Sequence, residues 1–492
     1  MYTEQLNKTL KVSLEQHSKE MTYWHKKLIE AYDLKKKEKV CYINNDITVM
    51  EIYVSVLYAI IAIATFLRAD FKSNITAEKR LNLKYFHFVS TEFYKAIFIV
   101  KQPNTLWCKF ESLLLIGNNK TLTELVNQIN DASSDFRTNY FDSGKRDISL
   151  HYDYNLEHVY KHLCDIEEES EVKHITSLFA LLQPLSLICS LYLKIIYPEE
   201  NTTNPIDESK WNQKFRTELR NNIYDNIGDS LQNFATYLDH NMESYRFIDK
   251  PQVRSLLSDN NYAHISTFRE CIKLSVLLHY FYLDLGTAVR GYLVSENYYE
   301  QQLHVIRINV IIYEGYKKIF LPQNHDDQGQ SLSLWEQYVR IPVLASGANE
   351  SIAEMKAIEK ILEDYSNNKE IKDIRHSYSH FRKNNKLCLI DLWSEVISLN
   401  PITELNKTID FLKLLSRIIK FSKPSLEHFA KKEYERVQNK LLSPLEDMFT
   451  KAIVSCRSRD ERENLLKYKE EFKNLILDTL NRQTNSQLKK KQ

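Results

Sequence analysis

Two hexapeptides of this chain combine an arginine, a polar residue and a histidine at the same spacing: Arg146-Asp-Ile-Ser-Leu-His151 and Arg375-His-Ser-Tyr-Ser-His380. Histidine suits proton transfer because it titrates near neutral pH, and arginine grips phosphate with a planar fork that keeps its charge. In a helix, or at its frayed end, residues five positions apart lie within about one and a half turns. The candidate catalytic residues are Arg146, His151, Arg375 and His380, and Asp147 and His376 are candidate supporting residues.

Similar patterns elsewhere in the chain are weaker. A sequence with 15 histidines contains Arg-x4-His by accident, and a histidine on a helix more often has a structural role than a catalytic one. Arg80 and His87 form a near match with a longer spacing, and we interpret them as surface residues. Arg220 begins a similar stretch, but Asp225 stands where the histidine is needed.

Other kinds of site find no support in the sequence. It contains no H-E-x-x-H motif, Walker loop or G-x-S-x-G motif. The seven cysteines lie far apart without a C-x-x-C pair, which excludes a zinc ribbon and favours a reducing compartment. The formal net charge of +1 lacks the basic excess of a typical nucleic-acid binder, so a nucleic acid would have to meet a local patch. No metal and no cofactor are expected.

The hexapeptides belong to a longer internal repeat. Glu92-Phe-Tyr-Lys-Ala-Ile-Phe98 matches Glu314-Gly-Tyr-Lys-Lys-Ile-Phe320 at five of seven positions. Farther along, Leu106-Trp-Cys-Lys-Phe110 in the first copy corresponds to Leu334-Trp-Glu-Gln-Tyr338 in the second. The chain has only five tryptophans, so a chance match of two of them is improbable. The hexapeptide arginine follows the tryptophan by 39 residues in the first copy and by 40 in the second. Three matches in the same order indicate a duplication.

Composition predicts helices. Eight glycines and ten prolines among 492 residues leave little material for tight hairpins or glycine-rich phosphate loops. The expected fold class is all-α, with two related helical bundles in tandem and helical arms at both ends. Superposition of the bundles is expected to place Tyr94 on Tyr316, Trp107 on Trp335 and Arg146 on Arg375.

Hydrophobic periodicity and polar, proline-containing stretches divide the chain. We expect an N-terminal helical arm at 1–44, a first bundle at 45–198, a linker and connector helix at 199–261, a second bundle at 262–424 and a charged C-terminal arm at 425–492. The expected helices cover 47–67, 83–100, 107–115, 121–130, 156–166, 172–196, 211–240, 265–293, 298–320, 334–340, 350–364 and 402–421. Polar loops at 131–145 and 365–370 lead into the hexapeptides.

Two stretches bear on location. Residues 3–39 are charged and offer no apolar signal segment, so the N-terminal arm is interpreted as a lead-in that adds nothing to a core. The most apolar stretch, Ile52–Leu67, has the length of a buried core helix and falls short of the roughly 20 residues of a membrane span. We therefore expect a cytoplasmic protein without a membrane contact.

The two hexapeptides, set in helical bundles, resemble those of the HEPN-domain family. Members of this family carry arginine, a polar residue, three further residues and histidine near the end of the third main helix. The resemblance covers roughly 45–198 and 262–424, and the hexapeptides are its most specific part. It implies a metal-independent endoribonuclease, commonly a toxin or an anti-phage defence protein, in which two such bundles pair to form one site.

The chemistry of RNA explains why such a site needs these residue types. RNA carries its own nucleophile, the ribose 2′-OH, so cleavage needs a base, an acid and a cation for the phosphorane charge. Arg146, His151, Arg375 and His380 are therefore expected to converge on one cleft, either within the chain or in a homo-oligomer. The partners are an RNA substrate and, in a defence system, an antitoxin or activator protein.

Two other functions compete with this one. A non-catalytic helical scaffold could bind RNA or a partner protein in the groove between its bundles, because some HEPN domains are not catalytic. An interaction protein could act through its charged terminal arms. Loss of both histidines discriminates between the enzyme and the other two functions.

Overall fold

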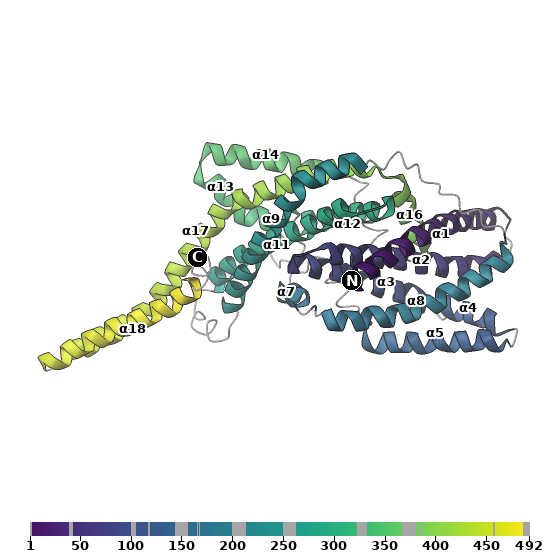
Figure 1. Cartoon of the computed structure of the whole chain (residues 1–492). Coiled ribbons are helices and arrows are strands. Elements are labelled where there is room, and N and C mark those ends of the chain that lie inside the picture. The colour runs from purple at the N-terminus through teal and green to yellow at the C-terminus, as the bar shows by residue number, and fades with distance from the viewer. Residues whose placement is uncertain are drawn as a thin grey trace. The chain divides into compact units, whose positions relative to one another are not determined.

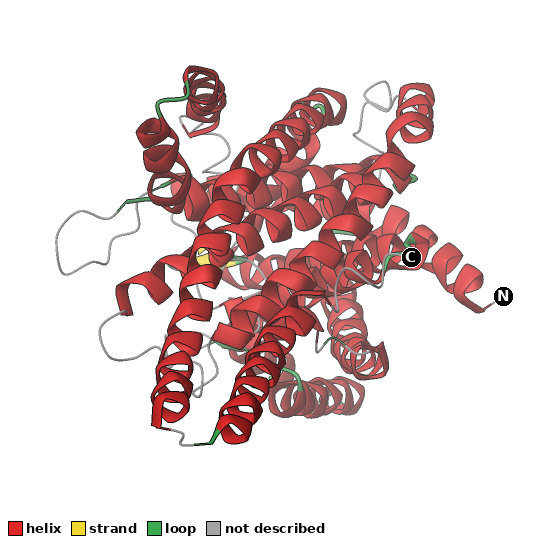
Figure 2. Cartoon of the chain, turned by 90° about the vertical axis from the view of Figure 1, so that its left-hand side faces the viewer, coloured by secondary structure: helices red, strands yellow, loops and turns green. Residues whose placement is uncertain are grey.

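The structure is a computed structural model that describes residues 2–38, 43–99, 105–116, 119–142, 156–164, 166, 168–198, 213–248, 262–321, 332–366, 380–383, 386–455 and 458–485. These residues are helical or connect helices, apart from two antiparallel strands of two residues each (Figure 2). The strands are β1 (Arg382–Lys383) and β2 (Lys386–Leu387). The expected all-α fold class is confirmed.

The chain forms two compact units that alternate along the sequence. Unit 1 comprises Met1–Ala235, His279–Lys318 and Ile358–Ser416, and unit 2 comprises Thr236–Leu278, Ile319–Ala357 and Arg417–Gln492. The ranges 45–198 and 262–424 therefore describe the two repeated stretches of the sequence. They do not coincide with the two compact units.

The helices are assigned to the units as follows. Unit 1 contains α1 (Tyr2–Glu38), α2 (Ile43–Lys72), α3 (Thr76–Phe98), α4 (Leu106–Leu115), α5 (Lys120–Asn139), α7 (Leu156–Cys164), α8 (Glu168–Ile196) and α16 (Leu389–Ser398). Unit 2 contains the π-helical turn η2 (Glu336–Arg340), α13 (Ile341–Ser346) and α18 (Arg459–Asn485). Five helices contribute residues to both: α9 (Gln213–Ile248), α11 (Tyr262–Val294), α12 (Tyr298–Phe320), α14 (Asn349–Ser366) and α17 (Pro401–Ser455).

The first repeated stretch forms a helical bundle within unit 1. In it α2 packs against α3, α4 and α8, and α5 packs against α8 and α4 (Figure 1). Side-chain caps set two helix starts, since Thr105 accepts a hydrogen bond from the N–H of Cys108 and Asn119 accepts one from Leu122.

Helix α1 is part of the core of unit 1, so the expectation that this arm adds nothing to a core is wrong. It packs along α2, and Leu14, Met21 and Trp24 are fully buried. The Trp24 ring meets the Tyr53 ring of α2 edge-on at 6.0 Å. The many lysines and glutamates of α1 lie on its other faces and mask this apolar stripe in the composition.

Helix α2 is the apolar centre of unit 1. It runs well beyond the expected stretch Ile52–Leu67 and is long enough to cross a membrane, as is α8. The most apolar window of α2 is 94% buried, as in the core helix of a folded domain, whereas that of α8 is 33% buried. Length and composition alone are therefore a weak indication of a membrane span.

Most helices differ from the expected bounds by a few residues, and three helices are instructive. Helix α5 continues to Asn139 because Ser133 and Phe136 extend its buried stripe, so the expected polar loop begins later. Helix α17 continues through Pro424 to Ser455, although proline usually costs a helix about 3 kcal/mol. Helix α16 was missed, and Trp393 makes it a core element.

The two copies of the repeated heptapeptide form the C-terminal ends of equivalent helices, α3 and α12. Both α3 and α12 have 23 residues and end at the phenylalanine of the repeated heptapeptide. Phe98 packs against Trp107 with ring centres 6.0 Å apart, and Phe320 packs against Trp335 at 5.5 Å. The two matches found in the sequence are thus joined by the same contact in each copy.

Reciprocal ion pairs link the two copies inside unit 1. Arg68 near the end of α2 lies 3.0 Å from Glu300 near the start of α12. In the opposite direction, Arg290 near the end of α11 lies 3.1 Å from Glu78 near the start of α3. All four side chains are buried. Positions 68 and 290 differ by 222, as do positions 78 and 300, so each ion pair is the counterpart of the other.

One contact lies where a symmetry axis would pass. Positions 85 and 307 also differ by 222, and the Arg307 guanidinium lies 4.0 Å from the centre of the Tyr85 ring. Two equivalent residues can touch each other only close to the axis that relates them. The helix pairs α2–α3 and α11–α12 therefore face each other as a pseudo-twofold pair, which supports the duplication.

Candidate functional site

The structure describes one of the six residues predicted for the site. The other five lie outside the described residues: Arg146, Asp147, His151, Arg375 and His376. His380 is described, and it directly precedes the buried Phe381.

His380 lies against a buried carboxylate of α3. Its Nδ1 is 3.7 Å from Oε2 of Glu92, a distance suited to an ion pair. The backbone N–H of Phe381 donates a hydrogen bond to the same oxygen at 3.2 Å, and the Phe381 ring meets the Tyr58 ring edge-on at 5.1 Å. The His380 side chain is 31% exposed, whereas that of Glu92 is 3% exposed. A solvent-accessible imidazole is thus held in front of a fixed carboxylate.

The approach to the first hexapeptide reaches the same helix. Phe141, five residues before Arg146, packs against Tyr94 of α3 with ring centres 5.3 Å apart. The Tyr94 hydroxyl donates a hydrogen bond to the carbonyl oxygen of Ser133 in α5 at 3.1 Å. Beyond the hexapeptide, α7 also contacts α3. Described residues that flank both hexapeptides therefore contact α3, at the neighbouring positions 92 and 94.

A carboxylate beside an imidazole has a clear chemical use. It orients the ring and stabilises the imidazolium that forms when histidine accepts a proton. His380 with Glu92 can therefore act in proton transfer.

A second cluster lies deeper in unit 1. His87 of α3 and Glu171 and His174 of α8 bring their ligand atoms within 4.8 Å of one another. His87 is only 6% exposed, so its interpretation as a surface residue is wrong. The cause is tertiary contact, because Glu171 and His174 of α8 lie against the His87 ring.

Sequence reasoning missed Glu92, Glu171 and His174. Glu92 is the first residue of the repeated heptapeptide and its counterpart Glu314 is buried too, so the repeat held a signal. Glu171 and His174 have the Glu-x-x-His spacing that places two ligands on one helix face. Their third member, His87, lies 84 residues before Glu171 and could be found only from the fold.

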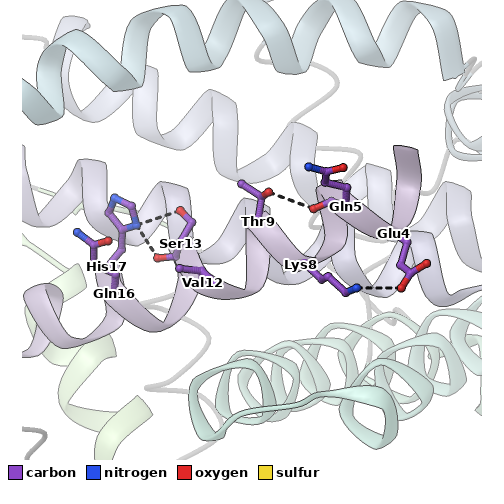
Figure 3. A pocket seen from close by; sticks show the side chains of 8 residues that line it. All are labelled: Glu4, Gln5, Lys8, Thr9, Val12, Ser13, Gln16 and His17. Atoms are coloured by element: carbon purple, nitrogen blue, oxygen red, sulfur yellow. Dashed lines mark hydrogen bonds and ion pairs between the residues drawn. The ribbon is translucent and has the colours of Figure 1, made fainter. Parts of the chain in front are cut away.

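A shallow depression runs along the N-terminal part of α1 (Figure 3). All of its lining residues belong to that one helix, and they pair among themselves: Lys8 with Glu4 at 3.0 Å, and His17 with the Ser13 carbonyl at 2.6 Å. A surface formed by a single helix offers no convergent set of groups, and we do not interpret it as a site.

Comparison with known proteins adds no relative: no protein-family model, curated protein sequence or solved structure matches this chain. The geometry and the sequence pattern therefore have to support any function by themselves.

Proposed function

We propose that this chain is a metal-independent endoribonuclease of the HEPN type, which cleaves single-stranded RNA through attack of the ribose 2′-OH. The observation that carries the proposal is the position of His380, which is partly exposed and lies in front of the buried Glu92 carboxylate. A toxin or defence effector is the biological role that fits such an activity.

Three further observations support the proposal. The chain is all-α, its repeated helix pairs form reciprocal contacts, and residues flanking both hexapeptides contact α3. In the proposed reaction, one histidine removes the 2′-OH proton and the other protonates the leaving 5′-oxygen. Arg146 and Arg375 bind the phosphate and stabilise its growing charge. The bond formed is 2′-O–P and the bond broken is P–O5′, which leaves a 2′,3′-cyclic phosphate.

Glu92 has a positioning role in this mechanism. It holds the Phe381 backbone and lies behind His380, so it fixes where the imidazole points. We expect Glu92→Gln to keep the hydrogen bond from Phe381 but to weaken the stabilisation of the imidazolium. The rate should fall less than in His380→Ala, and the pH profile of the rate should shift.

The experiment uses the full chain and labelled single-stranded RNA in buffer without magnesium. Cleavage should leave 2′,3′-cyclic phosphate ends and spare DNA of the same sequence, since DNA lacks the 2′-OH. We expect His380→Ala to lower the rate by about 10²-fold or more, the usual contribution of a general acid or base. His17→Ala, on α1, serves as the matched control.

Two results would contradict the proposed metal-independent cleavage. If cleavage requires magnesium, or if it survives the double substitution His151→Ala/His380→Ala, the hexapeptides are not catalytic. RNA binding without cleavage would then support the non-catalytic scaffold.

A further inference from the structure

The buried cluster of His87, Glu171 and His174 joins two helices of unit 1. Nε2 of His87 lies 2.7 Å from Oε2 of Glu171, and Nδ1 of His174 lies 3.8 Å from the same oxygen. Their exposed fractions are 6%, 6% and 3%. A carboxylate buried this deeply requires a compensating positive charge.

Two imidazoles and one carboxylate are a ligand set that zinc favours. Zinc binds histidine nitrogen at about 2.0–2.1 Å and carboxylate oxygen at about 2.0–2.2 Å, so tetrahedral ligands lie roughly 3.3 Å apart. The observed separation of His87 from Glu171, 2.7 Å, is shorter than this value, and that of His174 from Glu171, 3.8 Å, is longer. Movements of about half an ångström would bring the three atoms to zinc-binding distance. Magnesium prefers octahedral oxygen ligands and suits the cluster poorly.

The carboxylate of Glu171 faces both imidazoles. Its Oε2 lies nearest to Nε2 of His87 and also faces Nδ1 of His174, so the three ligand atoms converge on one region. A single cation bound there would supply the positive charge that the buried carboxylate requires.

Aromatic rings enclose His174. The Tyr140 ring stacks on the His174 ring at 5.0 Å with an angle of 13° between their planes. Phe86 lies at 4.6 Å and Phe136 at 5.5 Å from the same ring. A site walled by aromatic rings suits a structural metal ion better than a catalytic one, because a catalytic ion needs a position open to substrate.

We propose that His87, Glu171 and His174 bind one Zn²⁺ ion that links α3 to α8. This site is separate from the proposed RNA-cleaving residues and uses none of them. The counterpart of His87 in the second copy is Asn309, since positions 87 and 309 differ by 222. The zinc content should therefore be one ion per chain and not two.

The test measures zinc binding and thermal unfolding of the full chain, and it does not use RNA. After removal of metal with a chelator, the protein is titrated with zinc chloride or magnesium chloride. We expect one zinc ion per chain and a higher melting temperature with zinc, because a ligand that binds only the folded state stabilises it. Magnesium should have no such effect.

Variants keep the test decisive. Glu171→Gln has the same shape as the parent residue and should fold, yet it should lower zinc affinity more than about 100-fold, since even changes next to metal ligands cost about 10- to 100-fold. His174→Ala should act likewise, and His17→Ala should bind zinc as the parent does. The proposal is overturned if the parent binds no zinc, or if Glu171→Gln retains the same stoichiometry and affinity. Either outcome leaves the proposed cleavage chemistry untouched.

Discussion

The helix pair α2–α3 and its repeat, α11–α12, share a framework but carry different chemical groups. Each pair sends an arginine to a glutamate at the start of the other pair's second helix. In each, a phenylalanine that ends the second helix meets the repeated tryptophan. These shared contacts hold the copies in place, and a change on one side would have to be matched on the other.

The differences lie at other positions of the two pairs. The first copy has His87, with its partners on α8, where the second has Asn309. The second copy has Asp284, Gly291 and His304, where the first has Ala62, Ala69 and Asn82. The duplicated scaffold thus kept its reciprocal ion pairs and its Phe–Trp contacts. Other positions diverged, including some that add contacts between the copies, such as Asp284 with Lys84.

The largest effect on stability should come from Asp284, which has no charged counterpart in the first copy. Its carboxylate lies 2.8 Å from Lys84 Nζ and 3.3 Å from Arg307, and all three side chains are buried. Asp284→Asn leaves two buried cations without this charge, so we expect a loss of about 5 kcal/mol in the free energy of unfolding, measured by urea denaturation. Asp410→Asn, in an exposed pair with Lys413, should change it by less than about 0.5 kcal/mol. Similar losses for both variants would refute the role of the buried cluster.

The next effect tests whether the two reciprocal ion pairs are equivalent. Arg68→Met breaks its buried pair and a second pair with Glu296, and Arg290→Met breaks its buried pair and a hydrogen bond to the Tyr224 carbonyl. Each should cost about 3 kcal/mol in urea denaturation. Glu300 still accepts the Glu296 N–H, and Glu78 still accepts the Ser73 hydroxyl, which limits the loss. As a control, Arg417→Met breaks a half-exposed pair with Glu354 in unit 2 and should cost at most about 1 kcal/mol. Markedly unequal losses at Arg68 and Arg290 would break the comparison.

A smaller effect concerns the close approach of α11 to α12. A Cβ atom at Gly291 would lie 2.3 Å from Cε1 of His304, so Gly291→Ala should cost about 1–3 kcal/mol. The double variant Gly291→Ala/His304→Asn restores the residue types of the first copy, Ala69 and Asn82. It should recover most of the loss in thermal unfolding. Additive losses in a double-mutant cycle would show that the copies pack differently here.

The last effect appears only in acid. Burial, with the charges of Arg307 and Lys72, holds the pKa of His304 well below its usual value of 6.5. Below about pH 6.5 the unfolded state therefore binds a proton at His304 that the folded state does not bind. The free energy of unfolding falls as the pH is lowered through this range, and above about pH 6.5 His304 does not contribute to its pH dependence. The first copy has Asn82 at this position, which cannot titrate. Between about pH 7.5 and 5.5, the parent should lose more stability than His304→Asn, while His17→Asn should behave as the parent does.

Sequence periodicity predicted much of the fold because helix formation depends on residues three and four positions apart. The bounds of α12 were predicted to the residue, and those of α4 and α14 to within two residues. The pattern failed where charge masked an apolar stripe, as in α1, and where proline suggested an end at Pro424, beyond which α17 continues. Of the candidate site, the sequence pointed to His380 but not to the carboxylate behind it.

By itself, then, the sequence determined the helical class, the repeat and the two hexapeptides, because these depend on composition and on spacing along the chain. Only the tertiary structure decided that Glu92 lies behind His380, that His87 meets Glu171 and His174, and that Arg68 and Arg290 exchange partners between copies. Each of these contacts joins residues far apart in sequence. Helical periodicity carries no information about them, since it specifies which face of a helix is buried but not which helix covers that face.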